Sequence, residues 1–260
     1  PKSAVDIAVI HLPHISNFTD FDPLAVEPGV SVRYVRTLPE LDGADVIVIP
    51  GSKNTISDLL YLRKSGMEKK IKEFAGAGGM VAGICGGYQM LGMRISDPHR
   101  VDGPVGEAEG MGLLPVLTVM EKEKQTVQTA AKSLGTDFWE GDLDVRGYEI
   151  HMGTTERLEG TKPAFSVWDS GRGFRFDGAT AAGHRVWGTY LHGVFDSDGF
   201  RKSFLNNLRT QKGTGPSPTG SYELLKQEGF DKLADIVRTS LDMEKIYALI
   251  NSKVSRRSEG

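Results

Sequence analysis

The 260-residue chain contains a single cysteine, Cys85. One cysteine cannot form a disulfide within the chain, and no group of Cys and His residues has the spacing of a structural zinc site. No apolar run reaches the roughly 18–20 residues that are needed to cross a bilayer. No basic segment followed by an apolar one opens the chain, as a signal peptide would. These absences predict a cytoplasmic protein that has no disulfide, no metal site and no membrane contact.

Net charge is also small, because 31 Lys and Arg residues nearly balance 34 Asp and Glu residues. A formal charge of −3 predicts no strong attraction to nucleic acid or to an anionic membrane surface. Hydrophobic residues make up 39% of the chain, which is ordinary for a globular protein of one large domain or two small ones. The first residue is Pro1 rather than Met, so we expect a longer parent protein.

The first 93 residues alternate between predicted strands and predicted helices. Apolar, β-branched runs predict strands at 5–12, 30–36, 44–51 and 79–85. Residues 55–78 predict a helix, a break and a second helix, with Thr55 and Asp58 resembling a capping box. Apolar strands separated by helices are typical of an α/β fold. We therefore expect three layers, with a mostly parallel central sheet covered by helices on both faces.

The rest of the chain is richer in predicted strands and ends in predicted helices. Strands are expected at 112–120, 145–152, 164–169 and 181–192, followed by an amphipathic helix at 197–211. The sequence predicts a main domain at 1–211, a linker at 212–221 and a C-terminal helical extension at 222–251. We expect this extension to be a helical pair that breaks near Gly229 and packs on the main domain.

The stretch Gly83-Ile84-Cys85-Gly86-Gly87 lies directly after an apolar predicted strand and directly before a predicted helix. This is the context of a nucleophile elbow, in which a sharp turn leaves no room for Cβ atoms beside the nucleophile. The helix N-terminus favours a thiolate, and the Gly86 N–H can donate to an oxyanion. The alternative is a buried, inert cysteine, which is the usual state of a lone cysteine. The coincidence of pattern and context favours the nucleophile.

A cysteine nucleophile needs a base, and the sequence offers six histidines. We favour His192 because it lies at the end of the apolar segment VWGTYLH, where a strand end can face the elbow. His151, in GYEIHMG, is the second choice. The remaining histidines are less favoured because they lie in polar or strand-interior positions: His11, His14, His99 and His184.

A third segment, IPGSKNT at 49–55, ends a predicted strand at Pro50 and continues with Gly51. A glycine allows a backbone N–H to approach a ligand closely, so Gly51 is a candidate oxyanion donor. The alternative is an ordinary loop whose Ser52, Asn54 and Thr55 cap the next helix. Both roles can coexist, because both use the start of that helix.

Taken together, PGSKNT, GICGGYQ and GTYLHG resemble the triad-type class I glutamine amidotransferases, which have a flavodoxin-like fold. Further segments, namely ISNFTDFDPL, GYEIHMGTT, LHGVFDSDGFR and the C-terminal FDKLAD, resemble the carboxyl-terminal half of the cobyric acid synthase family. The resemblance implies a glutaminase that supplies ammonia for amidation of corrinoid carboxylates in cobalamin biosynthesis. It also implies that glutamine is the substrate and that a synthetase domain precedes Pro1 in the full-length protein.

The resemblance implies roles for named residues. The Cys85 thiolate would attack the side-chain amide of glutamine, and Gly51 and Gly86 would bind the oxyanion. His192 would first accept and then return a proton. Gln89 matches the glutamine of the Cys-x-x-x-Gln motif and would contact the substrate, as would Ser52 and His151.

Two departures from the family pattern limit these expectations. The family places a glutamate two residues after the histidine, but this position is Val194. A Cys85–His192 dyad is therefore expected, with Glu149 or Asp196 as candidates to orient the imidazole. The chain also has no G-x-x-x-x-G-K-[ST] phosphate loop. No cofactor is expected in this domain, whereas ATP and Mg²⁺ are expected in the synthetase half.

Other functions remain open from the sequence alone. A related amidotransferase could act on another acceptor, as cobyrinic acid a,c-diamide synthase or a cell-wall lipid amidating pair does. A cysteine hydrolase on a similar sheet is a third hypothesis, and Gln89 and the PGSKNT loop speak against it. An interaction module with an inactive site is the non-enzymatic hypothesis.

Overall fold

The structure is a computed structural model that describes residues 5–169, 173–181 and 185–255. It divides into two compact units, residues 1–220 and residues 221–260. His184 lies outside the described residues. Along the described ranges, no helix is both long enough and apolar enough to cross a membrane.

The core of the larger unit is a sheet with the strand order β11-β14-β15-β6-β4-β1-β3. Its five parallel strands are β15 (Val186–Thr189), β6 (Met80–Ile84), β4 (Val46–Ile49), β1 (Val5–Ile10) and β3 (Val30–Val35). At one edge, β14 (Ala179–Ala181) pairs antiparallel with β15, and β11 (Thr161–Lys162) pairs antiparallel with β14. The mostly parallel sheet predicted from the apolar runs is confirmed.

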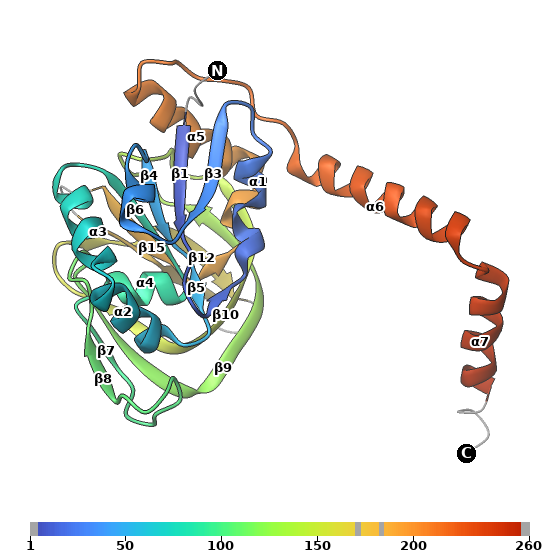
Figure 1. Ribbon diagram of the computed structural model, residues 1–260, viewed down its shortest axis with the longest axis horizontal. Helices are drawn as coiled ribbons and strands as arrows, with labels where there is room; N and C mark the ends of the chain where they lie inside the picture. The colour runs from blue at the N-terminus through green and yellow to red at the C-terminus, as the bar shows by residue number, and fades with distance from the viewer. Residues whose placement is uncertain (1–4, 170–172, 182–184, 256–260) are drawn as a thin grey trace. The chain divides into compact units, whose positions relative to one another are not determined.

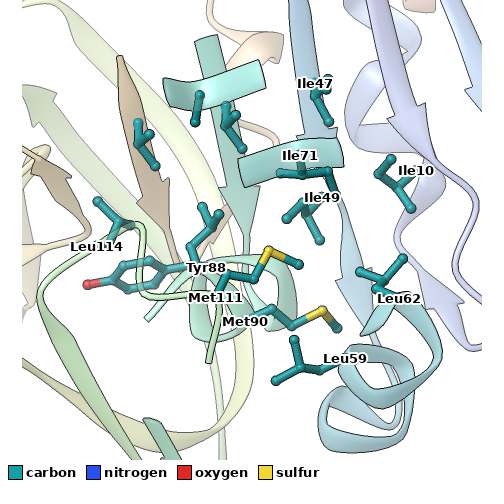
Figure 2. Close-up of a cluster of buried hydrophobic side chains, with 14 of the residues drawn as sticks. Ile10, Ile47, Ile49, Leu59, Leu62, Ile71, Tyr88, Met90, Met111 and Leu114 are labelled. Carbon is teal, nitrogen blue, oxygen red and sulfur yellow. The ribbon is translucent and has the colours of Figure 1, made fainter. Parts of the chain in front are cut away.

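Helices cover both faces of this sheet, as predicted (Figure 1). One face holds α2 (Thr55–Lys64), α3 (Met67–Gly76) and α4 (Gly86–Leu91), and the other holds α1 (Asp22–Ala25) and α5 (Asp198–Gln211). The strands divide their side chains between the two cores. Ile47 and Ile49 pack against the first set of helices, whereas Val46 and Val48 face the second. Figure 2 shows Ile47 and Ile49 among side chains of α2, α3 and α4.

A second sheet, mostly antiparallel, packs beside the first and has the order β13-β12-β9-β10-β16. Its strands are β9 (Val116–Ser133), β10 (Asp144–Arg157), β12 (Phe165–Asp169), β13 (Gly173–Asp177) and β16 (Leu191–His192), and β7 (Arg94–Ser96) and β8 (Glu107–Glu109) extend it. The sequence predicted strands in this region but not a separate sheet. The strand expected at 112–120 corresponds to β9, which begins later, at Val116, and is longer, because it continues to Ser133.

The predicted strand at 181–192 is divided between the two sheets. The chain leaves the main sheet after Thr189 and joins β10 at Leu191. Side chains satisfy the backbone at this crossing: Asp177 accepts from the Tyr190 N–H, and the Thr189 hydroxyl accepts from the Leu191 N–H. This crossing carries the chain from the main sheet directly to His192.

Short elements complete the region above the strand ends. β2 (Ile15–Ser16) pairs with β5 (Gly51–Ser52), and three 3₁₀ turns are η1 (Phe18–Phe21), η2 (Leu38–Leu41) and η3 (Val194–Asp196). The expected capping box on Thr55 is wrong. Asn54 caps α2 by accepting from the Ser57 N–H, and the Asp102 carboxylate accepts from the Thr55 N–H.

The smaller unit contains α6 (Tyr222–Ser240) and α7 (Met243–Ser255). The expected break near Gly229 is wrong, because α6 runs through this glycine and ends eleven residues later. A single glycine costs a helix only about 1 kcal/mol, which its neighbours in a long helix offset. The break comes at Leu241, which is extended, and Asp242 then accepts from the Lys245 N–H at the start of α7.

Candidate active site

The candidate site lies at the carboxyl ends of four parallel strands of the main sheet. The segments that follow β1, β4, β6 and β15 place residues 15–21, Gly51, Cys85 and His192 at this end of the sheet. The chain places β3 and β4 on opposite sides of β1, so the strand order reverses there. Ligands of open α/β sheets bind at the carboxyl ends of the strands beside such a reversal.

Cys85 sits on a sharp turn between β6 and α4. Its backbone has φ 51° and ψ −110°, a conformation that is rarely adopted by a residue other than glycine. Such strain persists only where the surrounding structure enforces it, and it is concentrated at functional sites. Cys85 is 6% exposed, and its Sγ lies 3.5 Å from the carbonyl oxygen of Ile150, to which the thiol can donate.

The glycines around Cys85 are required by close packing of α4 on the sheet. A Cβ on Gly87 would lie 1.9 Å from the carbonyl oxygen of Ile49, and one on Gly83 would lie 2.7 Å from the Gly87 carbonyl. A third, on Gly86, would approach the Ser52 nitrogen to 3.0 Å. These distances confirm the expectation that the turn leaves no room for side chains beside the cysteine.

His192 is fully buried at the end of β16, and the imidazole is held on three sides. Its Nδ1 lies 2.7 Å from Asp20, and its Nε2 lies 2.9 Å from the Asn17 side-chain amide. The Tyr148 ring stacks on the imidazole at a centroid distance of 5.2 Å. The ring is thus fixed in position and in orientation.

The surroundings raise the pKa of His192 from 6.5 to about 10. Burial is the largest influence and acts in the opposite direction, because it disfavours the charged ring. Hydrogen bonds and charge interactions with Asp20 and Cys85 together outweigh it. Asp20 and Cys85, its two principal partners, therefore both favour the protonated form of the ring.

Asp20 is the carboxylate that orients His192, which corrects the expected dyad. One of its oxygens faces Nδ1 at 2.7 Å, and the other accepts from the Gly193 N–H at 3.0 Å. Glu149, a candidate for this role from the sequence, instead pairs with His151 and Arg175. Asp196, the other candidate, lies in η3 beyond the Gly193 turn.

The sequence contained a signal for Asp20 that pattern reasoning did not use. The residue lies in ISNFTDFDPL, directly after the first predicted strand, where side chains reach the same sheet edge as the elbow. It is 172 residues from His192 along the chain, so no local spacing connects them.

The loop after β4 brings Gly51 to the imidazole. A Cβ on Gly51 would lie 3.2 Å from the His192 Cε1 and 2.8 Å from the Ser16 hydroxyl oxygen. Ser16 pairs with Gly51 between β2 and β5. Gly51 and Gly86 thus belong to the same small region beside Cys85 and His192.

Ser52 organises the loop rather than pointing freely into the site. Its hydroxyl donates to the Asp58 carboxylate at 2.7 Å and accepts from the Asn54 N–H at 3.0 Å. His14 also contacts Asp58, at 2.8 Å. These contacts fix the start of α2.

Gln89 is 2% exposed, and both ends of its amide are engaged. The oxygen accepts from the Thr55 hydroxyl at 3.2 Å, while the nitrogen lies 3.1 Å from the Met152 carbonyl and 3.1 Å from the Tyr190 hydroxyl. The side chain therefore ties α4 to α2 and β10.

His151 lies in a polar cluster next to the site. Its ring stacks on Tyr190 at 3.8 Å, and its Nε2 faces Glu149 at 3.2 Å. A cavity of about 230 Å³ is lined by this cluster, which also includes Arg175 and Asp177. Burial, followed by repulsion from Glu149, raises the pKa of Asp177 to about 6. His151 is therefore close to the site but is paired with a carboxylate of its own.

Comparisons with known proteins agree on the kind of domain. Residues 6–200 match the family model described as the CobB/CobQ-like glutamine amidotransferase domain. The chain is 49% identical over 251 residues to the cobyric acid synthase of Clostridium botulinum (strain 657 / Type Ba4), and 47% identical over 254 residues to that of Clostridium kluyveri (strain NBRC 12016). These alignments cover 96% and 97% of this chain but 50% of either relative. The chain thus spans about half the length of the curated relatives it matches.

Solved structures resemble it in fold. A chain from the structure of PurLQS from Thermotoga maritima superposes with a TM-score of 0.57 at 15% identity, covering 80% of this chain and 96% of that one. A glutamine amidotransferase crystal structure gives a TM-score of 0.55 at 16% identity, covering 78% and 98%. The family match covers most of the larger unit and identifies the domain. The chain belongs to the family of CobB/CobQ-like glutamine amidotransferase domains.

Proposed function

We propose that this chain is the glutaminase half of a cobyric acid synthase. It hydrolyses the side-chain amide of glutamine and delivers ammonia for amidation of a corrinoid carboxylate. The observation that carries the proposal is Cys85 on a strained elbow, beside a buried His192 whose other nitrogen is held by Asp20. A nucleophile, a base and an orienting carboxylate in this order form a complete triad.

The first step is formation of the thioester. The Cys85 thiol transfers its proton to His192 Nε2, and the sulfur attacks the amide carbon of glutamine. The high pKa of His192 favours the imidazolium, and hence the thiolate that attacks. Asp20 compensates the charge that the ring gains in this step.

The tetrahedral intermediate carries negative charge on its oxygen. In the proposal, the N–H groups of Gly51 and Gly86 bind this oxygen, the second of them at the start of α4. The proximity of Gly51 to His192 and of Gly86 to the Gly51–Ser52 strand supports this assignment. A Cβ at either position would lie within 3.0 Å of a neighbouring atom, so both positions need glycine.

The intermediate collapses when the imidazolium gives its proton to the leaving nitrogen, and ammonia departs. His192 then removes a proton from a water molecule, which attacks the thioester carbon and releases glutamate and the Cys85 thiol. The side chains of Gln89, Ser52 and His151 act around this centre by fixing α4, the loop after β4 and β10. Direct contact of these three with glutamine remains a prediction.

The acceptor half of the reaction belongs to the proposal as well. The relatives named cobyric acid synthase are about twice as long as their match to this chain. We assign ATP, Mg²⁺ and the corrinoid to that other half, which would act in cis. The family description also includes CobB-like domains, so a related acceptor such as cobyrinic acid is the alternative.

Glutamate release tests the proposal. The chain is incubated with glutamine, and glutamate is measured for the wild type and for Cys85→Ser. We expect slow hydrolysis by the wild type, because binding of the synthetase half can improve the organisation of the site. We expect none by the variant, because it lacks the thiol nucleophile. Equal rates for the two proteins would refute the catalytic role of Cys85. Adding corrinoid acids and ATP to a full-length protein would separate the two acceptors.

A further inference from the structure

The side chain of Asn17 contacts the imidazole atom that exchanges the proton with Cys85. Its amide nitrogen lies 2.9 Å from His192 Nε2, although the two residues are 175 positions apart in the sequence. Asp20 occupies the other ring nitrogen, Nδ1. Both nitrogens of His192 are therefore engaged by one short segment, and the triad described above uses only the contact with Asp20.

The backbone of Asn17 is built for this contact. It adopts the left-handed conformation, with φ 51° and ψ 42°, between β2 and η1. Asparagine, aspartate and glycine tolerate this conformation best. The residue before it, Ser16, pairs with Gly51, and the turn that follows carries Asp20. Asn17 thus lies between β2, which pairs with the Gly51 strand β5, and η1, which carries the Asp20 that contacts His192.

The Asn17 amide can hydrogen-bond to Nε2 of both the neutral imidazole and the imidazolium, but it does so through different atoms. A neutral imidazole with its proton on Nδ1 accepts at Nε2, so the Asn17 Nδ2–H donates to it. An imidazolium carries a proton on Nε2, so the Asn17 Oδ1 must accept it, which requires the amide to turn over. The two ends of an amide have nearly the same shape, so this exchange needs no movement of the backbone.

We propose that Asn17 is a positioning residue for His192, whose amide oxygen accepts from Nε2–H after the proton has left Cys85. This inference rests on the proposed function for its catalytic meaning. Hydrogen bonds to charged groups are about twice as strong as neutral ones. Asn17 therefore stabilises the imidazolium more than the neutral ring, and it keeps Nε2 aligned until the proton passes to the leaving nitrogen.

Other charged and titratable groups face the same ring. Asp20 in η1 and Cys85 at the elbow act on it directly, and Tyr148 of β10 stacks on it. Asp196 of η3 interacts with Tyr148 through its charge. A test must therefore change Asn17 while these four residues are kept.

The ring itself provides the measurement. The His192 pKa is followed by NMR in the wild type, in Asn17→Gly and in Asn17→Asp, all as the full chain. Glycine keeps the left-handed backbone and removes the amide, while aspartate keeps the shape and adds a negative charge. We expect the His192 pKa to fall by about one unit in Asn17→Gly and to rise in Asn17→Asp. The exposed His99 is the internal control for the measurement.

A His192 titration that is unchanged in both variants would overturn the proposal. If Asn17→Gly does not fold, the direction of the shift in Asn17→Asp decides alone, because this variant is isosteric. Glutamine hydrolysis is measured in parallel, and Asn17→Gly is expected to lower kcat about tenfold with little change in KM. A shifted pKa in a chain that hydrolyses no glutamine would support the role of Asn17 and refute the proposed function, so the two failures are distinguishable.

Discussion

At the scale of single residues, the site depends on long-range contacts to one buried ring. Cys85 and His192 could be predicted from the sequence because each lies in a local pattern, an elbow or a strand end. Asp20 and Asn17 could not, because their importance comes from the chain reversal that brings residues 15–21 to residue 192. Gln89 was found by its motif, but its burial and its saturated amide depend on three separate elements.

Replacement of Asp20 tests the triad. Asp20→Asn keeps the shape but removes the charge that supports the imidazolium, so we expect kcat for glutamine hydrolysis to fall by about 10²–10⁴-fold. The alkaline limit of activity, expected near the His192 pKa of about 10, should move to lower pH, because the ring loses its proton earlier.

Asp22→Asn is the matched control for that variant. Asp22 is an exposed carboxylate two residues further along the same segment, at the start of α1. Its replacement should leave kcat within about twofold of the wild type. Equal losses in the two variants would show that total negative charge, rather than the contact with Nδ1, is what matters.

At the scale of elements, the elbow is set by how closely α4 approaches β4. The parallel strands and their helices could be predicted because buried strands are continuously apolar. The second sheet was harder to predict, because β9 and β10 carry many exposed polar residues and because β12 and β16 join them from later parts of the chain. The break between α6 and α7 could not be predicted from Gly229, because one glycine costs a long helix only about 1 kcal/mol.

Gly87→Ala tests the close approach. The added methyl would meet the Ile49 carbonyl at 1.9 Å, so α4 must move away from the strand end. We expect the free energy of unfolding to fall by about 1–3 kcal/mol, and hydrolysis to fall more steeply, since Cys85 moves with the helix. Urea denaturation and glutamate release measure the two effects.

Gly76→Ala provides the comparison for that experiment. Gly76 ends α3, and a Cβ there meets nothing within 4 Å. This change should be neutral or should stabilise the protein by up to about 1 kcal/mol. A loss of stability in Gly76→Ala as large as in Gly87→Ala would mean that crowding at the elbow is not the cause.

At the scale of the whole molecule, the two units differ in how much hydrophobic core they contain. Residues 1–220 contain both hydrophobic cores and every residue of the candidate site. The chain up to Gly220 belongs to this unit, since the Gly220 carbonyl accepts from Arg201 of α5 at 2.8 Å. We therefore expect the unit to fold without α6 and α7.

Truncation after Gly220 tests this expectation. The shortened chain should unfold cooperatively, with a midpoint temperature within about 5 °C of the full chain, and it should retain most of the glutamine hydrolysis. Circular dichroism during heating and glutamate release measure these properties. A shortened chain without a cooperative transition would show that the smaller unit is needed for the fold, as expected if its helices pack on the main domain.

The most direct measurement of the central claim is covalent labelling of Cys85 by a diazo-ketone analogue of glutamine, read by peptide mass spectrometry. The account predicts one adduct, on the peptide that contains Cys85, with labelling slowed by excess glutamine and by Asp20→Asn. The Cys85→Ser protein should remain unlabelled. An adduct that glutamine does not suppress, or no adduct on a folded chain, would contradict the account.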